Sequence, residues 1–199
     1  MLKIKIIGIV GKTGCGKSSA ADYMTEKLPD AVKLDVDLLA KQIYAKRSDA
    51  VKKVAGCFGG EVLNSNGSIN FSCLGRKVFS DCREMGKLND IMFPLIYDEV
   101  SSFIKDNSDR KYIVIDAAVL FDAGLDGFCD SIIWIKAGKG KRENFLKCKN
   151  PGICSEDINQ RVKNQKIKIK KSGVNFIVEN DLALKDLYKK IDIIINSLR

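Results

Sequence analysis

The segment Gly11-Lys12-Thr13-Gly14-Cys15-Gly16-Lys17-Ser18 constrains the fold more than any other part of this 199-residue chain. It matches the pattern G-x-x-x-x-G-K-S, which needs a strand before it and a helix after it. An apolar, β-branched run covers 2–10, and 18–28 has helical periodicity up to Pro29. We therefore predict a buried parallel strand, a phosphate-binding loop and a helix in direct succession.

The residue types in this loop suit a nucleoside triphosphate. Glycines let the backbone curl so that its N–H groups point at a phosphate, and the following helix adds partial positive charge. Lys17 can reach the β- and γ-phosphates, and the Ser18 hydroxyl can join a Mg²⁺ shell. We assign ATP binding here to Gly11, Lys12, Thr13, Gly14, Cys15, Gly16, Lys17, Ser18 and Ser19. The alternative is a glycine-rich turn without a ligand.

The remaining pattern predicts an α/β protein. Apolar runs at 31–34, 112–115, 131–136 and 174–178 alternate with helical segments, which favours a parallel sheet with helices on both faces. We expect a three-layer P-loop NTPase fold with a five-stranded parallel sheet. Its expected parts are a nucleotide-binding core at 1–39, 109–138 and 173–199, a helical insertion at 40–108 and a helical lid at 139–172.

Two absences from the sequence narrow the chemistry. The chain has no histidine, which excludes Ser-His-Asp and Cys-His catalysis and leaves proton transfer to a carboxylate, lysine, tyrosine or water. It also lacks the N-K-x-D motif that reads guanine in GTPases. A compact kinase remains.

Three acids follow predicted strands. Asp35 and Asp37 come at the end of the second strand, and Asp116 closes the third. Because the carboxyl ends of parallel strands share one crevice, we expect these acids near the phosphate loop. Asp37 is the candidate base, and Asp35 and Asp116 with Ser18 are candidate Mg²⁺ ligands, partly through water. The alternatives are a helix N-cap at Asp37 and plain strand-end turns at the other two.

The positive charge is concentrated in one segment. The stretch 136–172 holds twelve Lys or Arg and three Asp or Glu, which accounts for the whole net charge of +9. Such a run can be a solvated face, a nucleic-acid patch or a cover for a polyphosphate. The phosphate loop favours the cover.

Cysteine use and hydropathy predict a cytoplasmic protein. Seven cysteines occur with no C-x-x-C pair, so we expect reduced, buried thiols rather than disulfides or a zinc site. No apolar run reaches the length of a membrane span, and no signal-peptide pattern follows the first residues.

In order and spacing, several segments together resemble the bacterial dephospho-CoA kinase family. The family's motifs, with the segments similar to them, are T-G-G-I-G-S-G-K-S at 8–18, D-A-D-x-x-A-R at 35–42, D-G-x-L-D-R at 66–71, L-N-x-I-x-H-P-x-I at 88–96, D-x-P-L-L-F-E at 116–122 and V-I-x-N-x-G at 178–181.

This resemblance implies ATP-dependent phosphorylation of the ribose 3′-hydroxyl of dephospho-CoA, the last step of coenzyme A synthesis. It implies that Asp37 is the general base, assisted by the catalytic Lys17. It also implies that 40–108 binds the CoA portion, that 139–172 is the lid and that Asn180 lies near the adenine. Arg142 and Lys149 become the lid's ATP-binding residues.

The chain departs from the family pattern at several places. Phe93 replaces the histidine before proline, Asn70-Phe71 replaces Asp-Arg, and Asp122 replaces glutamate. In the lid, Phe145 and Lys149 replace a pair of arginines, and a lysine cannot make the bidentate contact of arginine with phosphate. Arg142 or Arg161 would then supply the missing contact.

Other functions stay open at this point. The nearest is a P-loop kinase for another small acceptor, such as a nucleoside or nucleotide. A catalytically silent ATP-binding homologue is suggested by the departures. Nucleic-acid binding is disfavoured, because 136–172 has few aromatic residues for stacking on bases. We expect a monomer or small homo-oligomer that binds ATP, Mg²⁺ and dephospho-CoA, without a membrane or nucleic-acid partner.

Overall fold

The computed structural model describes residues 4–149, 158, 162 and 167–198, apart from the side chains of Ser80, Cys82 and Lys149. Contacts divide the chain into two compact units, each described here by itself. The sheet unit comprises Met1–Val36 with Phe103–Arg199, and the helical unit comprises Asp37–Ser102. The observed divisions thus fall at 36/37 and 102/103, where the sequence predicted 39/40 and 108/109. The roles of insertion and lid stay predictions.

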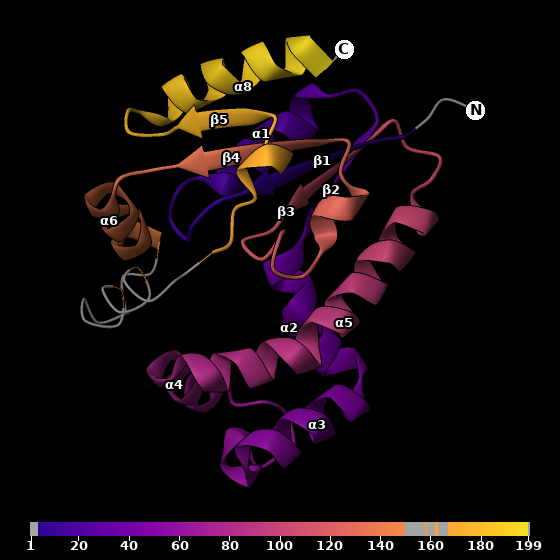
Figure 1. The fold of residues 1–199 in the computed structure, drawn as a ribbon, viewed down its shortest axis with the longest axis vertical. Coiled ribbons are helices and arrows are strands. Elements are labelled where there is room, and N and C mark those ends of the chain that lie inside the picture. The colour runs from indigo at the N-terminus through magenta and orange to yellow at the C-terminus, as the bar shows by residue number, and fades with distance from the viewer. Residues whose placement is uncertain (1–3, 150–157, 159–161, 163–166, 199) are drawn as a thin grey trace. The chain divides into compact units, whose positions relative to one another are not determined.

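One parallel sheet organises the sheet unit. Its strands stand in the order β2-β3-β1-β4-β5 (Figure 1). They are β1 (Lys5–Val10), β2 (Ala31–Asp35), β3 (Tyr112–Asp116), β4 (Ser131–Lys136) and β5 (Phe176–Glu179). The central strand, β1, is buried from Ile6 onward, as expected of a strand covered on both faces. The predicted α/β class and five-stranded parallel sheet are confirmed.

Helices α1 (Lys17–Lys27) and α8 (Leu184–Leu198) cover one face of this sheet. Alternate residues of β1, Ile7 and Ile9, belong to the same buried cluster as Met24 of α1 and Ile191 of α8. Burying a side chain of this size contributes about 1.5–3 kcal/mol. The buried apolar side chains of both helices therefore hold α1, and with it the end of the phosphate loop, against the sheet.

The other face of β1 carries Gly8, and the chain after β3 packs against it. A Cβ at Gly8 would lie 2.8 Å from the Cys129 sulfur and 2.9 Å from a methyl carbon of Leu120. These neighbours flank the short helix η2 (Leu125–Phe128), and Asp130 accepts a 2.9 Å hydrogen bond from the Ile6 amide. The segment 117–130 thereby seals the second face close to the strand that leads into the phosphate loop.

The helical unit is built from helices with their own core. It contains α2 (Val36–Lys46), α3 (Ser48–Phe58), η1 (Gly60–Val62), α4 (Phe71–Ser80) and most of α5 (Cys82–Asp106). Buried Val54, Phe58, Ile69 and Val78 belong to one apolar cluster of this unit. Between η1 and α4, an isolated antiparallel bridge joins Leu63 and Ile69.

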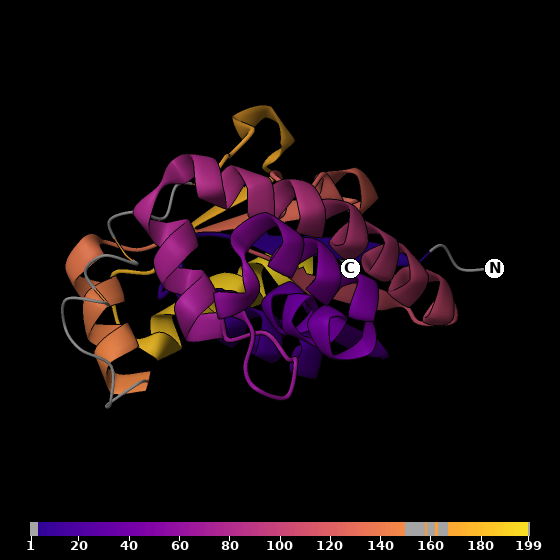
Figure 2. The same cartoon turned by 90° about the horizontal axis from the view of Figure 1, so that it is seen from below.

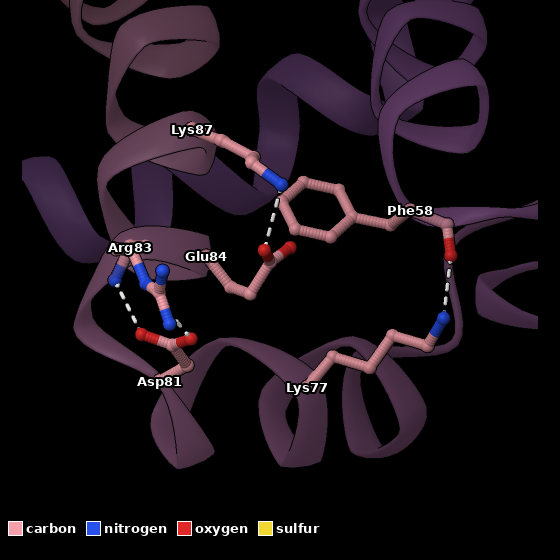
Figure 3. Close-up of polar contacts among 6 residues, drawn as sticks. All are labelled: Phe58, Lys77, Asp81, Arg83, Glu84 and Lys87. Carbon is pink, nitrogen blue, oxygen red and sulfur yellow. Dashed lines mark hydrogen bonds and ion pairs between the residues drawn. The ribbon is translucent and has the colours of Figure 1, made fainter.

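Polar contacts connect consecutive elements of the helical unit (Figure 3). Lys77 of α4 donates 2.6 Å hydrogen bonds to the Phe58 carbonyl at the end of α3 and to Glu61. The Asp81 carboxylate accepts from the Arg83 amide at 2.8 Å and so caps the start of α5. Asn70, at a family departure, caps α4 by accepting from the Cys73 amide.

Helix α5 continues through Pro94, a residue type that usually kinks or breaks a helix interior. Proline has no amide hydrogen and removes one i→i−4 hydrogen bond, yet the remaining bonds of a 25-residue helix hold the segment helical. Helix α2 begins at Val36, so Asp37 is its second residue and the alternative of Asp37 as N-cap is wrong.

The basic segment after β4 starts with helix α6 (Lys139–Lys149). Figures 1 and 2 both show α6, in orange-brown, beyond the end of β4. The rest of the helical lid predicted over 139–172 lies mostly outside the described residues. The prediction of helix is wrong for 167–170, which have no regular structure before η3 (Lys171–Gly173). There the Lys168 amide donates to Asp122 at 3.2 Å and the Lys170 side chain pairs with Asp126 at 3.1 Å. These contacts attach the segment before η3 to the chain that follows β3.

The thiols differ from the expectation of burial. Cys15 is buried, but Cys57 and Cys148 are exposed, and Cys73 and Cys129 are partly exposed; all five are free. Within the described part of the chain, no helix combines the length and apolarity that a membrane crossing requires.

Candidate active site at the phosphate loop

The loop between β1 and α1 has a backbone that only glycine tolerates at several points. Gly14 and Gly16 have φ values of 78° and 97°, in the left-handed region that disfavours other residues. A Cβ at Gly11 would overlap the backbone carbonyl oxygen of Ile135 in β4. Gly16 is also the N-cap of α1, so the free amides of the first helical turn face the loop. This is the geometry of an anion cradle.

Lys17 supports an anionic ligand in this loop. Its side chain is only 6% exposed, in the first turn of α1. Burying an ammonium group costs free energy unless negative charge is close, and bound phosphates would provide that charge. Lys12 is exposed, and Ser19 lies in the same first turn of α1 as Lys17.

Ser18 and Asp116 meet at the edge of the sheet. The Ser18 hydroxyl donates a 2.6 Å hydrogen bond to the Asp116 carboxylate, which is 3% exposed. Strand pairing sets Asp116 opposite Ile9 of β1 and opposite Asp35 of β2. Two acids and a hydroxyl are thus brought to the carboxyl ends of adjacent strands, next to the phosphate loop.

These oxygen groups fit Mg²⁺. The ion prefers oxygen ligands and keeps several water molecules, so it needs only one or two protein groups besides the phosphates. Among the described residues, no cluster of three or more His, Cys, Asp or Glu side chains could hold a metal by itself. A cation here would therefore depend on the nucleotide for the rest of its shell.

Helix α6 contacts the phosphate loop through Arg142. The guanidinium Nε donates a 2.9 Å hydrogen bond to the Thr13 carbonyl, and a Cβ at Gly14 would lie 2.8 Å from the Arg142 carbonyl. Arg142 is 5% exposed, and burial lowers the pKa of its guanidinium. One of its terminal nitrogens is buried without a hydrogen-bond partner. A phosphate oxygen would satisfy that donor.

Asn180, predicted near the adenine, lies against the loop itself. Its side chain is 7% exposed, and its amide nitrogen donates to the Cys15 carbonyl at 2.9 Å. A Cβ at Gly16 would lie 2.5 Å from that nitrogen. The carbonyl end of the same side chain accepts from Lys141 of α6 at 2.9 Å.

The Cys15 thiol is chemically quiet despite its place in the loop. Burial raises the pKa of this thiol, and the charge of Lys17 opposes the shift only in part. The thiol therefore stays protonated and does not act as a nucleophile near neutral pH. The backbone of Cys15 is what contributes to the loop.

Some predicted site residues are not brought together here. Asp37 belongs to the helical unit and is therefore not among the site residues that the sheet unit brings together. The Lys149 side chain and Arg161 lie outside the described residues. Sequence reasoning missed Lys141 because it stands among many lysines of the basic segment, and only its three-dimensional contacts distinguish it.

Comparison with known proteins identifies relatives of this chain. The family model described as dephospho-CoA kinase matches residues 5–186. A dephospho-CoA kinase from Fusobacterium nucleatum is 31% identical over 96% of this chain and 97% of its own. One from Borrelia garinii is also 31% identical, over 96% of this chain and 95% of its own.

Solved structures show the same fold. The dephospho-CoA kinase from Campylobacter jejuni superposes with a TM-score of 0.62 and 18% identity over 97% of this chain and 96% of its own. A shikimate kinase from Acinetobacter baumannii superposes with a TM-score of 0.54 and 14% identity over 100% and 96%. At such identities the likeness speaks for the P-loop kinase fold alone. With the match of the family model over nearly the whole chain, the conclusion is that this chain belongs to the dephospho-CoA kinase family.

Proposed function

We propose that the chain transfers the γ-phosphoryl group of ATP to the ribose 3′-hydroxyl of dephospho-CoA, which gives coenzyme A. The observation that carries the proposal is the Ser18–Asp116 pair, 2.6 Å apart, beside a loop whose glycines leave room for phosphate. Membership of the dephospho-CoA kinase family supports the choice of acceptor.

The residues of the sheet unit receive the nucleotide in this proposal. Loop amides and Lys17 bind the β- and γ-phosphates, and Ser18, Asp116 and Asp35 hold Mg²⁺ directly or through water. When bound, Mg²⁺ neutralises charge on the β- and γ-phosphates. Arg142 donates its free N–H to a phosphate oxygen, with Lys149 as a second cation, and this stabilises the charge of the transferring group.

Asp37 accepts the proton of the attacking hydroxyl in this proposal. Asp37 is two positions after Asp35 in the chain, so their Cα atoms are within about 8 Å of one another. Asp37 lies in the first turn of α2, directly after β2. A carboxylate base is also what a chain without histidine requires.

The helical unit binds the acceptor, and 139–172 serves as the lid. Exposed apolar side chains of the helical unit, which include Leu38, Phe71 and Tyr97, offer surface to the acceptor's uncharged arm. Closure of a basic lid would screen the triphosphate and exclude water. The cytoplasmic location and the monomer or small homo-oligomer stay predictions.

An acceptor panel tests the function. The chain is incubated with ATP, Mg²⁺ and dephospho-CoA, ADP release is followed, and the product is identified by mass spectrometry. We expect stoichiometric ADP and coenzyme A, and no ADP release with a dephospho-CoA analogue that lacks the 3′-hydroxyl. Lys17→Met serves as the inactive control.

The same panel separates the competing functions. Phe93, in place of the family histidine, favours a changed acceptor site, so adenosine, AMP and other nucleosides are included. ADP release with one of these, but not with dephospho-CoA, would replace the proposed acceptor. ATP binding without ADP release for every acceptor would favour a silent homologue.

A further inference from the structure

We propose that Lys141 and Asn180 form a relay that fixes the backbone of the phosphate loop and thereby sets the affinity for ATP. Both are positioning residues in this inference, acting through the Cys15 carbonyl rather than on the nucleotide. The inference rests on the proposed function, because it explains how the same nucleotide site is held in shape.

Asn180 is attached at three points, all within the sheet unit. Its backbone amide donates to the Lys136 carbonyl at 2.7 Å, directly after the paired ends of β4 and β5. Its side-chain nitrogen donates to the Cys15 carbonyl at 2.9 Å and packs against Gly16. The sheet therefore holds the backbone of Asn180, and Asn180 holds the loop.

The chemistry of the partners fixes the orientation of the Asn180 amide. A lysine ammonium only donates and a backbone carbonyl only accepts, so the oxygen must face Lys141 and the nitrogen must face Cys15. A flip by 180° would set two donors against each other on one side and two acceptors on the other. Lys141 thus selects the orientation in which Asn180 can hold the loop.

Lys141 links this relay to helix α6. Besides Asn180, its ammonium donates to the Leu182 carbonyl. The next residue, Arg142, donates to the Thr13 carbonyl of the same loop. Two consecutive residues of α6 therefore hold two loop carbonyls, one through Asn180 and one directly. A loop held in this way keeps its amides oriented before the nucleotide arrives, which lowers the cost of binding.

Burial argues that Asn180 acts through the loop. Its side chain is 7% exposed, and each end of its amide already has a partner in the protein. Lys141 likewise spends its ammonium on an amide oxygen and a carbonyl. A lysine that served as a phosphate ligand would instead present its charge to the nucleotide.

A double-mutant cycle on ATP binding tests the relay. Mg·ATP is titrated calorimetrically into the full-length wild type, Lys141→Met, Asn180→Ala and the double variant. We expect each single change to weaken Kd about tenfold, the effect of losing a hydrogen bond to a charged group. In the double variant the loss should stay near tenfold, because both changes break the same relay. A loss near one hundredfold, the product of two independent effects, would overturn the inference.

Three further measurements separate positioning from general effects. Lys139→Met removes the same charge from the same turn of α6, where Lys139 pairs only loosely with Glu143 at 3.6 Å, and should leave Kd within about twofold. Lys141→Arg should recover most of the affinity, since it keeps a donor. The KM for the acceptor should not change in Lys141→Met. If Asn180→Ala loses its native circular dichroism, the test is the Kd for ATP of Lys141→Met compared with that of Lys139→Met. Equal losses of affinity in these two variants would overturn the relay.

Failure of the relay and failure of the proposed function give different results. A wild type that phosphorylates dephospho-CoA but shows independent effects in the cycle removes the relay alone. If the wild type binds ATP and the variants show the coupling, but no acceptor supports ADP release, the proposed function is wrong and the relay stands.

Discussion

The sheet unit and the helical unit differ in the sequence separation of their internal contacts. In the sheet unit, the site depends on pairs far apart in sequence: Ser18 with Asp116, Thr13 with Arg142, and Cys15 with Asn180. In the helical unit, the polar contacts of Lys77 with Phe58 and of Lys87 with Glu84 join residues 19 and 3 positions apart. The phosphate loop therefore depends on segments from both sequence portions of the sheet unit, whereas these contacts of the helical unit join neighbouring segments.

This difference predicts how substitutions spread. A change near the loop alters groups contributed by several strands, so it should affect nucleotide binding and stability together. A change in the helical unit should stay local, because its polar contacts link segments that are close in the sequence. Asp37 is the proposed exception, since it belongs to the helical unit by its contacts and to the reaction by its role.

Asp37→Asn should have the largest effect, because it is a change in the helical unit that we expect to abolish activity. We expect kcat to fall by about 10²–10⁴-fold, because asparagine cannot accept the proton, while Kd for ATP stays within about twofold. Steady-state kinetics and an ATP titration measure the two quantities. Asp49→Asn is the matched control, since Asp49 is also the second residue of its helix, α3, and should leave kcat unchanged. Full turnover in Asp37→Asn would remove Asp37 as the base.

A pair of glycines sharpens the contrast in stability. Gly11→Ala should lower the free energy of unfolding by about 1–3 kcal/mol and weaken ATP binding, because the new methyl group meets the Ile135 backbone, which cannot move aside. Gly56→Ala, in the exposed interior of α3 with open space around it, should instead raise stability by about 0.5–1 kcal/mol. Urea unfolding followed by circular dichroism measures both. Equal effects at the two positions would contradict the contrast.

Alkaline pH tests the helical unit through Tyr44. Burial raises the pKa of Tyr44 to about 12, compared with about 10 in an unfolded chain. Between these values only the unfolded chain releases the proton, so stability is intact below pH 10 and falls as pH rises toward 12. Tyr44→Phe keeps the ring against Phe71 and removes this loss. Between pH 9 and 11, wild type should lose about 1 kcal/mol more than Tyr44→Phe in urea unfolding; parallel losses would show that Tyr44 does not matter.

The smallest expected effect is at Lys77, drawn in Figure 3. Lys77→Met removes the donor to the Phe58 carbonyl at the end of α3 and the ion pair with Glu61, so stability should fall by about 0.5–1 kcal/mol. Kd for ATP should not change, since the contact lies within the helical unit. Lys53→Met, on exposed α3, is the charge control. Weaker ATP binding in Lys77→Met would show that the two units are coupled.

Local patterns in the sequence were enough for the sheet class and the phosphate loop. The β-branched run before Gly11 and the periodicity after Ser18 leave one arrangement of strand, loop and helix. Parallel strands also bring Asp35 and Asp116 to the same edge, since strand ends share a side of the sheet. The strand order β2-β3-β1-β4-β5 was not predicted, because apolar runs of similar composition carry no information on their neighbours.

Features decided by distant partners could not be predicted. The helical structure expected over 139–172 is absent at 167–170, where carboxylates from the segment after β3 bind Lys168 and Lys170. Lys141 looks like its neighbouring lysines until Asn180 folds against it. The exposure of Cys57 and Cys148 was missed because both lie in helices whose apolar faces are set by packing.

The distribution of thiols gives the chain natural attachment points for spectroscopic probes. Cys57 on α3 and Cys148 on α6 are exposed, one in each unit, whereas Cys15 is buried and its raised pKa keeps it protonated. With the remaining cysteines replaced by serine, a donor and an acceptor dye on these two sulfurs would report the separation between the helical unit and α6 during turnover. The nucleotide loop itself would carry no label.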